Sequence, residues 1–159
     1  MDLIKTTLIK QYNKTMDMLS KVIQDYDIDL WSDDSEYKYP AWQIAYHALY
    51  YGNIYCAATE KSRMKWVKQR KNHHLLMKTK KQVFSEIYSK DDILEFLEFF
   101  RGHIEGYLEE LLPDHDCWPN WYDENQLEFH INNIRHLQHH TAEMIERSDI
   151  IQTFSYVWI

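Results

Sequence analysis

Histidine is the residue type of this chain that is best suited to metal chemistry. Nine of the 159 residues are histidine, and the segment RHLQHH places His136 and His140 four residues apart. On a helix, this spacing puts both imidazoles on one face, one turn apart, where they can bind the same metal ion. Leu137 follows His136, so the glutamate of the HExxH metalloprotease motif is missing. The alternative interpretation, which the spacing alone favours, is the polar face of a surface helix.

A third imidazole comes from a different part of the chain. His47 lies in the middle of the uncharged segment 40–59, where a buried imidazole needs a partner for each ring nitrogen. A backbone carbonyl or a tyrosine is the more common partner, but His47, His136 and His140 together would supply three nitrogens. Three protein ligands with an open fourth position are typical of a catalytic zinc site. His139 either faces outward or is an alternative ligand.

Four long helices are expected to position these histidines. Apolar residues recur at helical spacing, and the predicted helices cover residues 4–26, 40–59, 89–112 and 124–147. Ser89 with Asp92, and Asp123 with Gln126, are the expected amino-terminal caps of the last two helices. The run 25–38 between the first two helices is predicted to be a loop.

The last helix shows two stripes of opposite character. The residues expected to face the core are Leu127, Ile131, Ile134, Leu137 or Gln138, Thr141 and Ile145. The residues of the opposed polar stripe are Asn132, Asn133, His136, His140 and Glu143. In this pattern, either the histidines face solvent or they meet a partner helix.

The composition favours helix over sheet. The chain has three glycines and three prolines, which are too few for the many turns of a β-sandwich or barrel. We therefore predict an all-α fold, a four-helix bundle in one domain that spans residues 1–159. The roughly 30-residue connection between the second and third helices can cross the whole bundle. Within it we expect a short helix at residues 82–88, with Val83 and Ile87 facing inward.

The three glycines all fall inside predicted helices, at Gly52, Gly102 and Gly106. A glycine in a helix costs up to about 1 kcal/mol relative to alanine. We therefore expect these positions to allow close approach of a neighbouring helix or to leave room for a pocket.

The charge distribution and the cysteines limit the class of protein. The net charge of −7 argues against a nucleic-acid-binding protein. Cys56 and Cys117 do not form a disulfide framework and the opening segment lacks an apolar signal core, so we expect a cytoplasmic protein. The segment 40–59 carries polar residues and is interpreted as a buried helix, not a membrane span. The basic segment 61–81 is interpreted as a solvated connection.

Two stretches resemble one known family. YPAWQIAYHALYYGNIY is similar to the second helix of the DinB-like proteins, and LEFHINNIRHLQHHTAEM is similar to their fourth helix. The resemblance implies an up-down-down-up bundle with a long crossover between helices 2 and 3, often assembled as a homodimer. It also implies a divalent metal held by His47, His136 and His140.

The chemistry that the resemblance implies is less specific. Three imidazoles suit several divalent metals, of which we expect Zn²⁺ or Ni²⁺. Some DinB-like proteins bind a low-molecular-weight thiol at the metal, so the expected function is a thiol S-transferase-like enzyme or a hydrolase. The candidates for a catalytic group are Tyr50, Tyr51 and Glu143, and Glu143 stands where such proteins often have glutamine. Glu143 could orient a ligand, act as a base or face water.

A second functional class fits the same sequence. The alternative is a non-catalytic helical bundle that binds a small apolar ligand or a protein partner. The residues that could line its pocket are Trp42, Tyr46, Trp118 and Trp121. The apolar tail at residues 150–159 must be covered by the bundle itself or by a neighbouring molecule.

Overall fold

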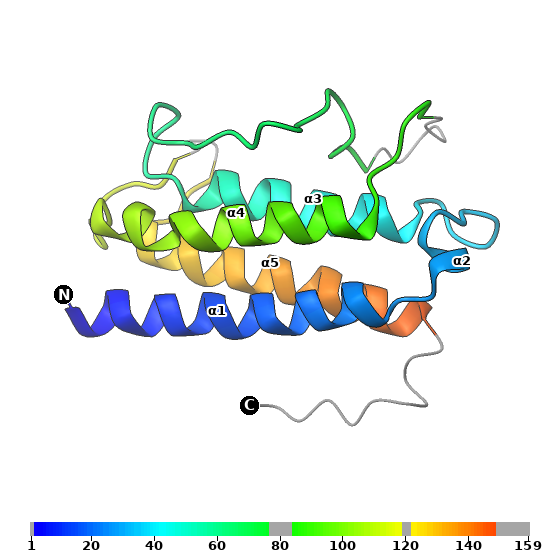
Figure 1. The fold of residues 1–159 in the computed structure, drawn as a ribbon. Helices are drawn as coiled ribbons and strands as arrows, with labels where there is room; N and C mark the ends of the chain where they lie inside the picture. The colour runs from blue at the N-terminus through cyan, green and yellow to red at the C-terminus, as the bar shows by residue number, and fades with distance from the viewer. Residues whose placement is uncertain (1, 77–83, 119–121, 149–159) are drawn as a thin grey trace.

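Helices form the fold of the part of the chain that the structure describes (Figure 1). The computed structural model describes residues 2–76, 84–118 and 122–148. Its helices are α1 (Asp2–Asp25), α2 (Ile28–Trp31), α3 (Ala41–Cys56), α4 (Lys90–Glu109) and α5 (Gln126–Arg147). Within these ranges the only extended pairing is an isolated bridge between Asp116 and Asn125. The all-α class predicted from the composition is therefore confirmed.

The four long helices pack side by side around one apolar core. α1 contacts α4 and α5, and α3 contacts the same two helices. In Figure 1, α1 and α5 run in one direction and α3 and α4 run in the other. The polar contacts agree, since Lys5 near the start of α1 donates to the carbonyl of Glu109 at the end of α4. The histidines of α3 and α5 therefore lie on adjacent, antiparallel helices.

The predicted caps are confirmed at α4 and wrong at α5. Ser89 and Asp92 form the expected capping box of α4. At α5 the box is formed by Asn125 and Glu128, so the helix begins two residues later than predicted. Asn125 caps as well as an aspartate does, and Glu128 is the acceptor that lies three residues after it.

The two connections differ from their predictions. The run 25–38 contains the single turn of α2, which buries Trp31. No helix forms over the described part of 82–88, residues 84–88, and Ile87 is exposed instead of facing inward; Val83 lies outside the described residues. Trp31 Nε1 donates to the carbonyl of Tyr88 (2.9 Å), and the Tyr88 hydroxyl accepts from the amide of Arg70 (2.9 Å). Arg70 Nη1 also donates to the carbonyl of Ile87 (3.1 Å), so distant side chains take two backbone carbonyls that a helix would otherwise use.

The expectation of close approach holds for one glycine of three. A Cβ on Gly52 would lie 3.0 Å from Leu137 Cδ2 and 3.0 Å from Phe100 Cε1, so α3 lies close to both α4 and α5 here. The same prediction is wrong for Gly102 and Gly106, because a Cβ on either would meet nothing within 4 Å. Both face away from the neighbouring helices.

The uncharged segment forms the most buried helix of the fold. Most side chains of α3 are buried, including Trp42 and Tyr46 in the centre of the core. Among the helices that the structure describes, none is long and apolar enough to cross a membrane. The predicted apolar tail, residues 150–159, lies outside the described residues.

Candidate metal centre

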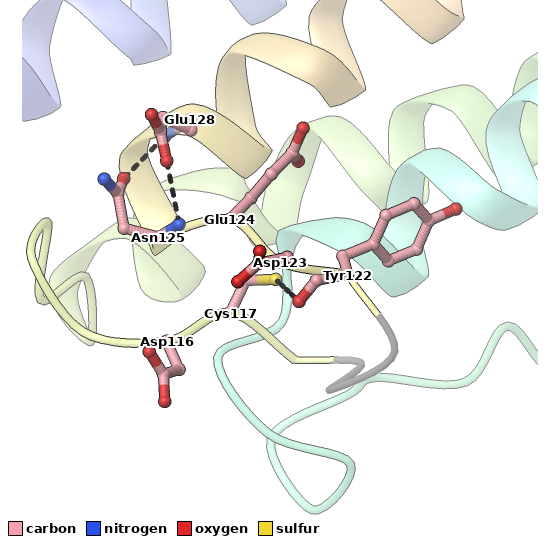
Figure 2. A pocket seen from close by; sticks show the side chains of 7 residues that line it. All are labelled: Asp116, Cys117, Tyr122, Asp123, Glu124, Asn125 and Glu128. Carbon is pink, nitrogen blue, oxygen red and sulfur yellow. Dashed lines mark hydrogen bonds between the residues drawn. The ribbon is translucent and has the colours of Figure 1, made fainter.

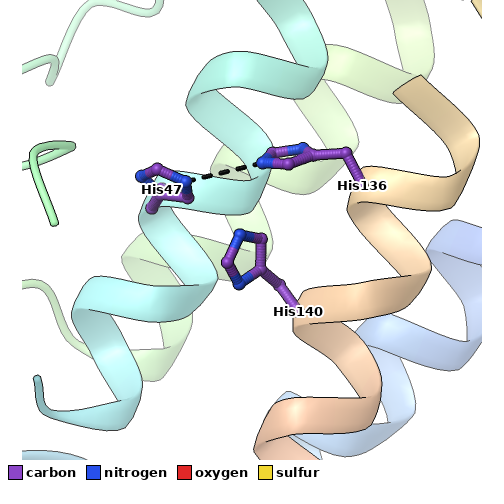
Figure 3. Close-up of side chains that lie close together, drawn as sticks. All are labelled: His47, His136 and His140. Carbon is purple, nitrogen blue, oxygen red and sulfur yellow. Dashed lines mark hydrogen bonds between the residues drawn. The ribbon is translucent and has the colours of Figure 1, made fainter. Parts of the chain in front are cut away.

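Three histidines from two helices face one another in the structure (Figure 3). His47 comes from α3, and His136 and His140 come from α5; we refer to them as the histidine cluster. One ring nitrogen of each lies within 4.8 Å of the other two. His136 Nε2 and His47 Nε2 are 3.5 Å apart, and two ligands of a tetrahedral zinc ion lie about 3.4 Å apart. The structure thus brings together the three histidines that the sequence predicted.

The hydrogen bonds of two of these rings decide which nitrogen faces the cluster. His47 Nδ1 lies 2.6 Å from the carbonyl oxygen of His74. Because a carbonyl only accepts, Nδ1 carries the proton, and the lone pair of the neutral ring is on Nε2. His140 Nδ1 lies 2.9 Å from a carboxylate oxygen of Glu143. A metal ion would therefore meet Nε2 of both rings.

Of the three rings, His136 has the weakest hydrogen bonding. Its Nδ1 atom is buried and has no hydrogen-bond partner among the described residues. Without a metal, Nε2 must donate to His47 Nε2, since that atom carries a lone pair. A cation between the rings would take the lone pairs of both Nε2 atoms and move the proton of His136 to Nδ1. The cluster therefore has nitrogen lone pairs that a cation can bind, but too few N–H donors to pair all of its nitrogens with one another.

Burial keeps two rings of the cluster, His47 and His136, uncharged at pH 7. It lowers the pKa of His47 to about 4, and burial together with the neighbouring His140 lowers the pKa of His136 to about 3. Neutral imidazole is the form that binds a metal. The hydrogen bond from His140 holds the pKa of Glu143 below its usual value, and Arg147 adds to this effect. At pH 7 the site therefore has two neutral rings and an ionised carboxylate at its edge.

Tyrosines line the side of the cluster along α3. The Tyr51 ring centroid lies 4.8 Å from that of His47, and the Tyr55 ring lies 6.0 Å from that of His136. Burial raises the pKa of Tyr51 and of Tyr55. Both are therefore neutral phenols at pH 7, which can donate a hydrogen bond to a ligand but cannot act as bases.

A second group of potential ligands shares one member with the cluster. Ligand atoms of His139, His140 and Glu143 also lie within 4.8 Å of one another, and His139 is exposed. Glu143 in this group already accepts from His140 and from Arg147. The histidine cluster is the better metal site, because its nitrogens face one another with fewer competing partners.

The sequence interpretation missed two buried polar residues of α5. Asn133 was placed on the polar stripe but is 1% exposed, whereas Ile131, expected in the core, is 49% exposed. His130 is buried too, and its Nδ1 lies 2.9 Å from the Tyr12 hydroxyl. His130, Asn133, Leu137 and His140 recur at spacings of three and four residues, so the correct face could have been read from this register.

A separate hollow lies where α5 begins (Figure 2). It has a volume of about 390 Å³, and the carboxylates that line it are Asp116, Asp123, Glu124 and Glu128. Glu128 is used in the cap of α5. Burial raises the pKa of the Cys117 thiol at its edge, so this thiol is not an activated nucleophile. No member of the histidine cluster lines this hollow.

Two of the four residues expected to line the aromatic pocket of the alternative function lie in the core instead. Trp42 and Tyr46 are core residues with almost no exposed surface. Trp118 packs against the core and is partly buried, and Trp121 lies outside the described residues. The comparisons with known proteins add no further candidate, because no family model, curated protein or solved structure matches the chain.

Proposed function

We propose that this chain is a DinB-like protein whose histidine cluster, His47, His136 and His140, holds one divalent metal ion. The directions of the four long helices and their contacts support an up-down-down-up four-helix bundle with a long crossover between its second and third helices. The sequence motifs of α3 and α5 support the same family. The metal that suits three neutral imidazoles with an open position is Zn²⁺ or Ni²⁺.

One observation carries the proposal. Three ring nitrogens from two helices lie within 4.8 Å of one another, and the Nδ1 atom of one of these rings, His136, is buried without a partner among the described residues. A shared cation would stabilise nitrogens gathered in this way, because no hydrogen bond can satisfy all three rings at once.

The bound metal would act as a Lewis acid that lowers the pKa of a thiol or a water molecule in its open position. This supports a thiol S-transferase-like activity or a hydrolase activity. In the transfer, the thiol sulfur forms a bond to an electrophilic carbon, the leaving group departs with the electron pair of its bond, and the thiol proton goes to solvent. Tyr51, whose ring lies beside that of His47, would be a neutral hydrogen-bond donor to the substrate, whereas the Tyr55 hydroxyl is paired with that of Tyr122.

Metal content is the direct test. Protein purified without a histidine tag is supplemented with Zn²⁺ or Ni²⁺, dialysed and analysed by inductively coupled plasma mass spectrometry. We expect about one ion per chain, and its loss in His47→Ala and His136→Ala. The matched control is His103→Ala on α4, which lies in neither ligand group. Substoichiometric metal in the supplemented wild type would contradict the proposal.

Two further measurements locate the ion. If His139→Ala lost the metal while His47→Ala kept it, the ion would belong to the second group, and the proposed site would be wrong. A metal that binds only the folded state stabilises it by about 2.7 kcal/mol at a free concentration of 100 times Kd. We therefore expect a chelator to lower the melting temperature of the wild type and to leave that of His47→Ala unchanged.

The homodimer and the reaction are proposed on the family resemblance. Light scattering after size exclusion tests the dimer, which a monomeric mass would exclude. The reaction is tested with small thiols and a chloro-arene, and with a nitrophenyl ester. We expect turnover of one of these that disappears in His136→Ala.

A further inference from the structure

One face of α5 carries a row of side chains that begins in the histidine cluster and ends at the last residue of the helix. His136, His140, Glu143 and Arg147 follow one another at intervals of four, three and four residues. These intervals keep all four on one face of the helix. The row connects a ligand of the proposed metal to the segment that precedes α3.

The contacts in this row are continuous. Glu143 Oε2 accepts from His140 Nδ1 at 2.9 Å, and Glu143 Oε1 accepts from Arg147 Nη2. Arg147 Nη1 donates to the carbonyl of Tyr39 at 2.9 Å, and the guanidinium lies 4.5 Å from the centre of the Tyr37 ring. Arg147 is thus held from two sides by the segment before α3.

The side chains of this row are largely shielded from solvent, so water competes little for their hydrogen bonds. The side chains of His140, Glu143 and Arg147 are 9%, 25% and 13% exposed. A carboxylate that binds both an imidazole and a guanidinium loses the freedom to rotate toward the cluster. Glu143 therefore fixes the ring of its neighbour instead of entering the site.

The three rings of the histidine cluster differ in the hydrogen-bond partner of their Nδ1 atom. His47 is held by a backbone carbonyl, His140 is held by the carboxylate of Glu143, and His136 Nδ1 has no partner among the described residues. Carboxylates in contact with a metal-bound histidine set its tautomer and orientation. His140 is the ring on which such a carboxylate acts here.

We propose that Glu143, held in place by Arg147, is a positioning residue that keeps His140 in its Nδ1–H tautomer with Nε2 turned toward His47 and His136. This role rests on the proposed function, since it is the metal that Nε2 would meet. It excludes the other two roles open to Glu143, a general base in the site and a solvated side chain.

The tautomer can be measured on the metal-free wild type, whatever the metal affinity is. Long-range ¹H–¹⁵N correlation spectra near about pH 8, above the ordinary histidine pKa, distinguish Nδ1–H from Nε2–H rings. We expect His140 in the Nδ1–H form in the wild type and a mixture of forms in Glu143→Ala. An Nε2–H ring at His140 in the wild type would overturn the proposal.

Cobalt binding then tests the consequence for the site. The probe is Co²⁺ alone, and its visible absorption reports both affinity and coordination geometry. We expect Glu143→Ala to weaken Co²⁺ binding by about 10- to 100-fold and to change the absorption bands. Glu143→Gln keeps an oxygen acceptor for His140 Nδ1, so we expect it to recover most of the affinity.

The control and the outcomes separate this role from a structural one. Glu146→Ala and Glu146→Gln change an exposed glutamate of the same helix and should leave affinity and bands as in the wild type. Wild-type affinity in Glu143→Ala, or equal losses in Glu143→Ala and Glu143→Gln, would overturn the positioning role. If the wild type itself bound no Co²⁺, the proposed function would fail, and the tautomer measurement would still decide what Glu143 does.

Discussion

A second group of buried polar side chains lies on α1 and on the two helices of the histidine cluster, α3 and α5. The second group, the buried polar network, consists of Tyr12, Cys56, His130 and Asn133. In this network the Asn133 amide donates to the Tyr12 hydroxyl (3.1 Å) and to the carbonyl of Gly52 (2.9 Å). The Tyr12 hydroxyl lies 2.9 Å from His130 Nδ1. Each of these contacts pairs a donor with an acceptor, whereas the histidine cluster brings together three ring nitrogens that one shared proton cannot satisfy.

The difference shows what separates a structural histidine from a ligand. His130 and His136 lie on one helix, and burial lowers the pKa of both, to about 4 and about 3. His130 is matched by a hydroxyl group from α1. His136 faces another imidazole and has a buried Nδ1 without a partner among the described residues. His130 and His136 are therefore alike in residue type and in burial. They differ in the group that each ring meets, a hydroxyl group for His130 and another imidazole for His136.

The largest expected effect is on metal binding. His136→Leu should weaken metal binding by more than the ~10- to 100-fold that loss of an outer hydrogen-bond partner costs. The metal-free protein should keep its free energy of unfolding or gain up to about 1 kcal/mol, because a buried unpaired nitrogen is removed. Urea unfolding with a chelator and metal titration measure the two quantities. A large loss of stability in the metal-free state would show that the cluster is a structural network as well.

A substitution in the buried polar network should have the opposite pattern, a loss of stability without a loss of metal affinity. Asn133→Leu should lower the free energy of unfolding by about 1–3 kcal/mol, because the Tyr12 hydroxyl and the Gly52 carbonyl lose their donor. Metal affinity should stay as in the wild type. Urea unfolding and Co²⁺ titration of the same preparation check this pair of results, and a parallel loss of affinity would mean that the two groups are not independent.

The pH dependence of stability should differ between buried and exposed histidines. The pKa of His130 is about 4 when folded and near 6.5 when unfolded, so the unfolded chain binds more protons between these values. Stability is then fully present above about pH 6.5 and falls as the pH approaches 4, by at most about 1.4 kcal/mol per pH unit from this residue. Urea unfolding from pH 4.5 to 8 should show a shallower slope in His130→Gln.

Exposed His115 provides the control for this slope. His115→Gln should leave the slope of the metal-free protein unchanged. A slope in His130→Gln equal to that of the wild type would mean that folding does not lower the pKa of His130.

The smallest expected effects concern the glycines. Gly102→Ala and Gly106→Ala should each stabilise the protein by about 0.5–1 kcal/mol, because both face open space in a helix. Gly52→Ala should not, since its Cβ would press on Leu137 and Phe100 beside the carbonyl that Asn133 binds. Thermal unfolding of the three variants measures this difference, and equal stabilisation at all three would show that α3 can move away from its neighbours.

Much of the fold and the set of candidate ligands could be predicted from local sequence signals. The capping pair Ser89 and Asp92, the apolar period of α1 and the i, i+4 spacing of His136 and His140 act within one or two helical turns, where geometry is nearly fixed. The errors fall where a partner distant in sequence competes. Ile87 and its neighbours form no helix because Trp31 and Arg70 bind the backbone carbonyls of Tyr88 and Ile87, and Asn133 is buried because Tyr12 and Gly52 accept its protons.

Local sequence patterns are enough to predict that the chain is helical and that one face of α5 carries His136, His140, Glu143 and Arg147. Periodicity decides this, because a helix places residues by their spacing alone. The packing of the helices was needed to place His47 opposite that face and to bring His130 to a hydroxyl group instead of another imidazole. The packing of separate helices determines which lone pair meets which donor. The spacing of residues within one helix cannot predict these contacts.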